Sequence, residues 1–215
     1  MSSTRTTRRT PAARRTPATR RTAIVIASLG LAIASTSATV SAASAATSAP
    51  RAKTGAHCVA HVTSHTTTCY DTFREAIADA TDGRVTDAPE APAKAAKDKG
   101  FLAEINAPAG KRDARAAAGL QGGVVGAVVY WDWNYGGASW TMEIPEGCKD
   151  NGTWDWGWSD LGNWNDGISS LIPANNCWVG LYSDIYYNGT NQLYTKSTPY
   201  VGDAMNDQAS SIQLT

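Results

Sequence analysis

The sequence predicts an all-β C-terminal domain, a two-sheet sandwich, preceded by a signal peptide, a small cystine-containing α/β segment and a linker. From residue 124 onward, short apolar and aromatic runs alternate with Gly, Asn and Asp, which is typical of antiparallel strands joined by turns. The same stretch contains an internal duplication, and a duplicated unit of about 90 residues can close a small sandwich. All 8 Trp lie in it, so the composition changes sharply at this boundary.

The first 45 residues have the organisation of a cleaved secretory signal. Residues 1–22 are rich in Arg, Ser and Thr, contain no acidic residue, and are followed by a short apolar stretch that begins at Ala23. This stretch is too short for a bilayer, which needs roughly 20 apolar residues. We therefore expect secretion, with cleavage between Ala42 and Ala46, and no membrane span. A basic arm that binds nucleic acid is the alternative, but it does not explain the apolar stretch.

Residues 46–85 are expected to form a small disulfide-linked segment with one helix. Glu75 lies three positions after Thr72, as in a capping box, and a Gly follows where the helical pattern ends. Residues 86–123 mix Pro with Ala, Lys and Gly and have no sustained apolar period. This composition predicts a flexible linker, with one short helical piece near residues 97–105.

The four cysteines suit an oxidising compartment, where exported thiols form disulfides. Three pairings are possible, and we expect Cys58–Cys69 and Cys148–Cys177 because each of these bridges stays within one region of similar composition. A metal site is the alternative for the first pair, since three histidines surround it: His57, His61 and His65. Against this alternative, the chain contains no C-x-x-C motif.

Two sequence patterns recur in the same order in the C-terminal domain of residues 124–215. The pattern Y-x4-Y-x-G occupies residues 130–137 and 182–189, and N-D-x-x-S-S occupies residues 165–170 and 206–211. The Gly of the first pattern permits a turn with positive φ. The second pattern collects carboxylate, hydroxyl and turn-carbonyl oxygens, which are the ligands that Ca²⁺ prefers. Asx-turns without an ion are the alternative, but both copies carry a carboxylate and no basic neighbour, so we expect calcium.

The duplicated pair of patterns resembles the calcium-binding βγ-crystallin domain of microbial secreted proteins. The resemblance covers residues of about 125–215 and implies two Greek-key motifs whose polar loops exchange ligands, so that each ion is held by both loops. It implies two Ca²⁺ sites. Their carboxylates would come from Asp166 and Asp207, their carbonyl oxygens from Gly167 and Gln208, and their hydroxyls from Ser169 and Ser210.

The first copy is longer than the second, and the additional residues lie within 151–163. Trp154, Trp156 and Trp158 alternate in this insertion, so an extended conformation would place all three on one side. They would then either cover an edge of the core or form an exposed aromatic platform for a glycan or a protein partner.

Charge and composition exclude several classes of function. The formal net charge is zero, but residues 124–215 contain 2 basic and 10 acidic residues, so this domain repels the phosphates of nucleic acids and anionic lipids. All three His precede residue 66, and no G-x-S-x-G motif occurs. We therefore expect a protein that does not bind nucleic acid and is not an enzyme.

The expected function is that of a secreted, monomeric calcium-binding module with an interaction or envelope-associated role, in which calcium stabilises the fold. The resemblance also implies an alternative. Secreted metalloprotease inhibitors of soil actinomycetes and some killer-toxin-like proteins use the same fold, so the chain could act as a protease inhibitor or an antimicrobial protein.

Overall fold

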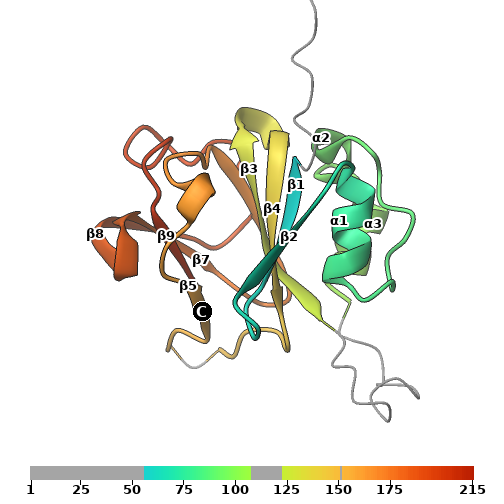
Figure 1. Ribbon diagram of the computed structural model, residues 1–215, viewed down its shortest axis with the longest axis horizontal. Coiled ribbons are helices and arrows are strands. Elements are labelled where there is room, and N and C mark those ends of the chain that lie inside the picture. Colours follow the sequence, from blue (N-terminus) through green and yellow to red (C-terminus); the bar gives the residue numbers. More distant parts are fainter. Residues whose placement is uncertain (1–55, 108–122, 151) are drawn as a thin grey trace, which may run out of the picture. The chain divides into compact units, whose positions relative to one another are not determined.

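The computed structural model of the chain describes residues 56–107, 123–150 and 152–215 (Figure 1). The expected secretory signal, residues 1–45, lies outside these residues, as do residues 108–122 of the expected linker. In the part of the chain that is described, no helix combines the length and apolar character needed to cross a membrane.

The described residues form two β-sheets in which all but one of the paired strands are antiparallel (Figure 1). The first sheet has the order β2-β1-β4-β3-β6, formed by β1 (His57–His61), β2 (Thr66–Tyr70), β3 (Val124–Asp132), β4 (Gly136–Ile144) and β6 (Ser170–Pro173). The second has the order β5-β9-β7-β8, formed by β5 (Trp156–Trp158), β7 (Val179–Asp184), β8 (Asn188–Tyr194) and β9 (Ser211–Leu214). This arrangement confirms the two-sheet sandwich expected for the C-terminal part of the chain.

Each half of the duplication contributes a segment to the sheet of the other half. β5 belongs to the first half, but it pairs with β9 in the second sheet. Thr198 belongs to the second half, but it forms an isolated bridge with Leu171 of β6 in the first sheet. The two halves are therefore interlocked, which brings their polar loops to one end of the sandwich.

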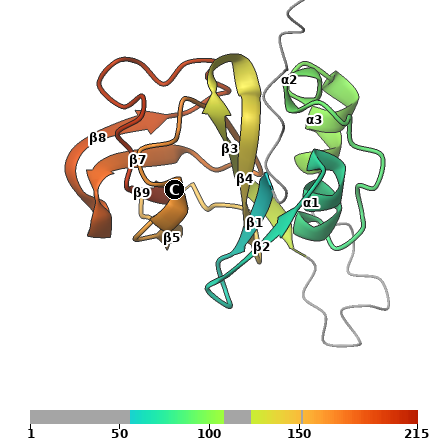
Figure 2. The same ribbon diagram turned by 45° about the horizontal axis from the view of Figure 1, so that its top comes forward.

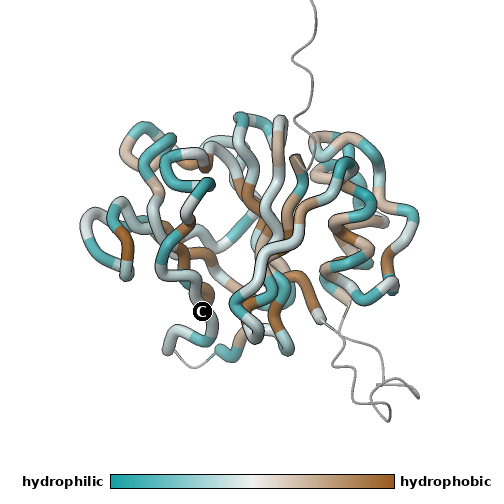
Figure 3. The backbone as a smooth tube through the Cα atoms, viewed as in Figure 1, coloured by the Kyte–Doolittle hydropathy of each residue, from teal (hydrophilic) through white to brown (hydrophobic). Residues whose placement is uncertain are grey.

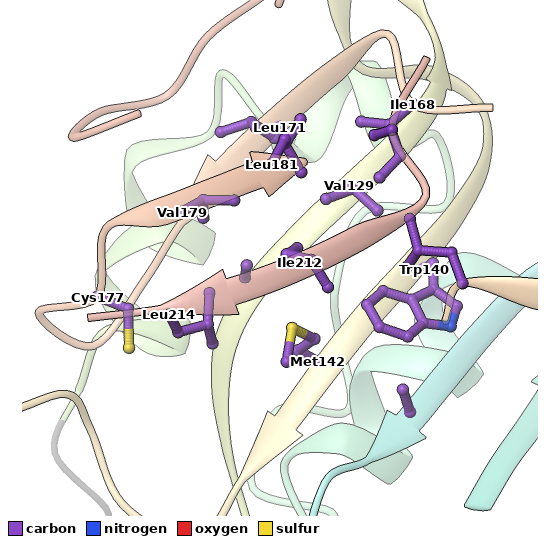
Figure 4. Close-up of a cluster of buried hydrophobic side chains, with 14 of the residues drawn as sticks. Val129, Trp140, Met142, Ile168, Leu171, Cys177, Val179, Leu181, Ile212 and Leu214 are labelled. Carbon is purple, nitrogen blue, oxygen red and sulfur yellow. The ribbon is translucent and has the colours of Figure 1, made fainter. Parts of the chain in front are cut away.

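One hydrophobic core fills the space between the two sheets. Figure 4 shows Val129, Trp140 and Met142 of the first sheet facing Leu181 and Ile212 of the second. These five side chains are buried because alternate residues of each strand point to its inner face. Along the backbone, the hydrophobic stretches follow the strands and the first helix, whereas the loops are mostly hydrophilic (Figure 3).

A helical layer covers the outer face of the first sheet (Figure 2). It is made of α1 (Phe73–Ala80), α2 (Pro92–Ala95) and α3 (Lys99–Ile105). A second core lies under this layer, in which Phe73, Ile77 and Phe101 of the helices cluster with Val128 of β3 and Ile172 of β6. Both faces of the first sheet are therefore covered by apolar side chains.

The helical layer corrects the domain organisation that the sequence indicated. Residues 86–107 were expected to be a flexible linker with one short helical piece near residues 97–105. α3 lies where that helical piece was expected, but α2 was not expected, and Phe101 and Ile105 are buried. The segment before them is not separate from the sandwich either, since β1 runs parallel to β4 with Cys58 opposite Trp140. Helices of four and seven residues are too short to produce a recognisable apolar period, which is why the composition resembles that of a linker.

Helix α1 begins as its capping box indicates. The hydroxyl of Thr72 accepts a hydrogen bond from the backbone N–H of Glu75 at 3.2 Å, and the carboxylate of Glu75 accepts from the N–H of Thr72 at 3.2 Å. The helix ends before Gly83, which has a φ of 74° and donates its N–H to the carbonyl of Ala78. These contacts satisfy backbone groups that a helix terminus otherwise leaves without partners.

Both expected disulfides are confirmed. Cys58 of β1 is bonded to Cys69 of β2, directly opposite it in the strand pair, and Cys148 is bonded to Cys177. No described cysteine is free. Complete pairing of these cysteines fits an oxidising environment.

Candidate functional site

The site is built on two hairpins with nearly identical backbones, one in each half of the duplication. In the first hairpin, between β3 and β4, Asn134 has a φ of 54° and Tyr135 a φ of 65°. In the second, between β7 and β8, Tyr186 and Tyr187 have φ values of 57° and 61°. Gly137 follows the first turn at φ 71°, and a Cβ there would come within 2.7 Å of the carboxylate of Asp132. The Gly of Y-x4-Y-x-G is therefore required by the turn.

Two segments pack against these hairpins: the first arc, residues 165–170, and the second arc, residues 206–211. The last serine of each arc fastens it to the hairpin of its own half. In the first half, the hydroxyl of Ser170 donates to the carbonyl of Asp132 at 2.7 Å and accepts from the N–H of Tyr135 at 3.0 Å.

The second half repeats these contacts at the same distances. The hydroxyl of Ser211 donates to the carbonyl of Asp184 at 2.7 Å and accepts from the N–H of Tyr187 at 3.0 Å. The final Ser of N-D-x-x-S-S therefore has a structural function. In the sequence, only the repetition of this serine in both copies indicated that it matters.

The two arcs lie side by side and are joined by a reciprocal pair of backbone hydrogen bonds. The N–H of Asp166 donates to the carbonyl of Ala209 at 3.0 Å, and the N–H of Asp207 donates to the carbonyl of Ile168 at 3.3 Å. The φ values of the two aspartates are 56° and 54°, so the backbone has the same left-handed conformation in both arcs. The structure thus brings together the two segments that the sequence indicated.

The aspartate side chains are exposed and oriented by their neighbours. The side-chain amide of Asn165 donates to Asp166 at 2.8 Å, and that of Asn206 donates to Asp207 at 2.8 Å. Neither carboxylate forms an ion pair with a described basic residue. Each half thus presents an uncompensated carboxylate in a defined position.

The two serine hydroxyls expected as ligands are placed differently. The hydroxyl of Ser169 in the first arc lies 3.4 Å from Oδ1 of Asp207 in the second arc. The hydroxyl of Ser210 instead donates to the carbonyl of Ser183 at 2.7 Å. The arrangement of hydroxyl and carboxylate oxygens is therefore not the same in the two halves.

The other two expected ligands differ in their surroundings. Gly167 is buried, and a Cβ there would meet the indole ring of Trp131, 2.7 Å from its Cη2 atom. Gln208 is exposed, and its side-chain amide donates to the carbonyl of Asp207 at 2.7 Å. A larger residue than Gly at position 167 would displace the tryptophan that covers the first arc.

The donor chemistry of the arcs fits a hard cation. Carboxylate, hydroxyl and carbonyl oxygens are the usual ligands of Ca²⁺, which tolerates irregular geometry. In the described ranges, no cluster of three or more His, Cys, Asp or Glu side chains is arranged to hold a metal ion. A cation at the arcs would therefore need neutral oxygens beside the carboxylates.

The histidines near the first disulfide do not gather around a common centre. Cys58 and Cys69 are oxidised, and Nδ1 of His57 lies 2.9 Å from the hydroxyl of Ser139. The ring of His61 separates two carboxylates, with Nε2 at 3.1 Å from Asp79 and Nδ1 at 3.3 Å from Glu143. The cysteines of this segment therefore form a disulfide, and His61 contacts two carboxylates, so these residues do not form the metal site considered as an alternative.

The sequence pattern predicted that the three alternating tryptophans would lie on one side. In the structure they do not. Trp156 and Trp158 pack against the core between the sheets, and Trp158 contacts Trp140 with ring centroids 5.7 Å apart. Trp154 precedes β5, is 44% exposed, and lies over Gly180 next to Tyr182. Since Trp154 lies outside the strand, the alternation rule does not apply to it.

The most exposed tryptophan among the described residues is one that the sequence patterns did not single out. Trp133 is 57% exposed, and its indole N–H donates to the side-chain oxygen of Asn206 at 3.1 Å. Trp131 is 41% exposed and packs against Trp164. A difference between the two copies could have indicated these exposed tryptophans in the sequence. Ser183 and Ile185 occupy the positions equivalent to Trp131 and Trp133.

Comparisons with solved structures find similar bacterial domains. A double-mutant form of a betagamma-crystallin domain from Clostridium beijerinckii is 31% identical, over 41% of this chain and 93% of that chain, with a TM-score of 0.32. A second structure of a betagamma-crystallin domain from this organism is 28% identical over 41% and 95%, with a TM-score of 0.33. A betagamma-crystallin domain from Flavobacterium johnsoniae is 26% identical over 42% and 93%, with a TM-score of 0.31.

No family model matches the chain, and no curated protein does. The duplicated patterns nevertheless form matching hairpins and adjoining arcs within two interlocked sheets. With 31% identity across 93% of one solved domain as well, the chain contains a βγ-crystallin domain.

Proposed function

We propose that the two arcs bind Ca²⁺ and that calcium stabilises the folded protein. The observation that carries this proposal is the position of Ser169, whose hydroxyl lies 3.4 Å from the Asp207 carboxylate across the boundary between the arcs. A cation held there contacts both halves of the duplication. Its charge also compensates a carboxylate that has no described basic partner.

The stabilisation follows from where the ligands lie in the sequence. Ser169 and Asp207 are 38 positions apart, so the unfolded chain does not hold them together. A ligand that binds only the folded state at ten times its Kd adds about 1.4 kcal/mol to the free energy of unfolding. Extracellular modules bind calcium weakly, with Kd values of about 0.1–1 mM. Calcium at such a site controls stability rather than acting as an intracellular signal.

The proposed setting is outside the cell, and the proposed role is non-enzymatic. Two disulfides and the expected secretory signal support export. The likeness to solved betagamma-crystallin domains supports a binding module rather than an enzyme. The module then serves in an interaction at the cell surface or in the medium.

Thermal unfolding of residues 46–215, with millimolar calcium and with a chelator, tests this proposal. We expect calcium to raise the Tm, and we expect Asp166→Asn and Asp207→Asn each to reduce that increase. Asp87→Asn is the matched control, because Asp87 is an exposed aspartate on the connection between α1 and α2. A Tm that does not change with the chelator would rule out calcium as a stabiliser.

A further inference from the structure

The surface beside the second arc presents an aromatic pair in a fixed orientation. The rings of Trp133 and Tyr200 lie 4.7 Å apart, and the N–H of Asn134 donates to the carbonyl of Pro199 at 2.8 Å. The hydrogen bond from the Trp133 indole to Asn206 also holds the ring in place. The loop after β8 accordingly runs beside the hairpin of β3 and β4 in both views (Figures 1 and 2). We call Trp133, Tyr200, Asp203 and Asn206 the Trp133 surface.

Negative charge surrounds this aromatic pair. The hydroxyl of Tyr200 donates a short hydrogen bond to the carboxylate of Asp203. This bond is the main reason why the pKa of Tyr200 is raised, and the charges of Asp203 and Asp207 raise it further. Both aspartates are exposed, and neither forms an ion pair with a described basic residue.

Few basic residues of the same domain are available to neutralise this surface. Residues 124–215 contain only Lys149 and Lys196 against 10 acidic residues. Lys149 pairs with Glu146 at 2.9 Å, and Lys196 is exposed on the loop that leads to Tyr200. The domain therefore offers an excess of negative charge to any partner.

We propose that the Trp133 surface binds an Arg or Lys side chain presented by a basic segment of a protein partner. A cation placed over an aromatic face is attracted by the ring quadrupole, and a carboxylate at the rim adds Coulomb attraction. The ring of Trp133 is tilted by 49° against that of Tyr200 and its N–H is engaged with Asn206, yet 57% of the residue remains exposed to a ligand. The carboxylate of Asp203 attracts a cation, whereas a neutral sugar gains no Coulomb attraction from it.

The second hairpin provides an internal comparison. The position equivalent to Trp133 in that hairpin is Ile185, which is 40% exposed and lies on a turn of the same geometry. An aliphatic side chain offers no quadrupole to a cation. The proposed site is therefore the indole of Trp133 and not the equivalent position in the second hairpin, where the neighbouring Tyr186 is the exposed ring.

Binding of the acetylated and amidated peptide GRRGRG to residues 46–215 in calcium-containing buffer tests the proposal. The readouts are tryptophan fluorescence and the shift of the Trp133 indole N–H signal in NMR. We expect saturable binding that weakens at least tenfold in Trp133→Ala and several-fold in Asp203→Asn. Ile185→Ala, the matched control, should bind the peptide as the wild type does. A melting curve of each variant verifies that it is folded.

Three outcomes would overturn the proposal. Unchanged binding in both Trp133→Ala and Ile185→Ala would mean that the peptide responds only to the net charge of the domain. Binding of neutral chitotriose at the same indole, with no response to the arginine peptide or to its citrulline analogue, would make the surface a glycan site instead. If the citrulline analogue binds as tightly as the arginine peptide, the positive charge is not what is recognised.

Discussion

The hydroxyl of Ser169 lies 3.4 Å from Oδ1 of Asp207, although the two residues belong to different halves of the duplication. The equivalent hydroxyl of Ser210 does not repeat this contact, because it donates to the carbonyl of Ser183 at 2.7 Å. The two halves therefore have nearly the same backbone but different arrangements of candidate ligands.

Removal of these two hydroxyls should separate calcium binding from structure. Without calcium, Ser169→Ala should unfold like the wild type, because a contact of 3.4 Å is at best a weak hydrogen bond. Ser210→Ala should lose about 1 kcal/mol under the same conditions, since it removes a hydrogen bond of ordinary length. With calcium, Ser169→Ala should show the weaker binding in titration. Unchanged calcium affinity in Ser169→Ala would contradict a ligand role for this hydroxyl.

The last serines of the arcs should act independently of calcium. Ser170→Ala leaves the N–H of Tyr135 and the carbonyl of Asp132 without their partner, and Ser211→Ala does the same in the second half. Loss of such buried hydrogen bonds costs about 1–3 kcal/mol. Chemical unfolding with and without chelator should give the same loss in both conditions. A loss that appears only with calcium would instead make these serines ligands.

The helical layer should be an integral part of the fold. Phe101→Ala removes a buried ring that contacts Phe73, at a centroid distance of 5.9 Å, and should cost about 3–5 kcal/mol. Leu102→Ala is the matched control, since Leu102 is only half-buried and should cost less. Urea unfolding measures both variants. If Phe101→Ala unfolds like the wild type, residues 99–105 contribute nothing to stability.

Stability should fall on mild acidification because of His57. Burial lowers the pKa of this imidazole from its ordinary value of 6.5, so the folded state binds fewer protons than the unfolded state. Its contribution is present above pH 6.5 and is lost as the pH falls through the lowered pKa. His57→Gln should therefore lose less stability than the wild type between pH 7 and pH 5, measured by urea unfolding.

Glu143 changes the stability with pH in the opposite direction to His57. The comparison of the wild type with His57→Gln allows for this effect. Burial raises the pKa of this carboxyl above 4.5, despite the opposing effect of His61, so its stability contribution is present below pH 4.5 and is lost as the pH rises through the raised pKa. The effect is common to the wild type and His57→Gln, so it cancels in their difference. Equal pH slopes for the two proteins would show that His57 is not the sensitive group.

Local patterns predicted the parts of the fold that depend on neighbouring residues. The capping box of Thr72 and Glu75 located α1, and the repeated N-D-x-x-S-S pattern located two arcs that do lie together. The pairing of β1 with β4 is different, since Cys58 and Trp140 are 82 positions apart and neither strand indicates its partner. Long-range parallel pairing of this kind has no local signature.

The sequence predicted which segments form the candidate site, but it did not predict which side chains are exposed around it. The aspartates follow from the motif, but the exposed position of Trp133 depends on the loop after β8, which packs beside the hairpin. Trp154 was expected to share a side with its alternating neighbours, but it precedes β5 and covers Gly180 instead. Both differences arise from tertiary contacts that no periodicity describes.

Calorimetric titration of residues 46–215 with calcium tests the central proposal most directly. We predict saturable binding at two sites, with Asp166→Asn and Asp207→Asn each reducing the binding and Asp87→Asn leaving it unchanged. Absence of binding heat at millimolar calcium, together with a Tm that the chelator does not alter, would contradict a calcium site at the arcs.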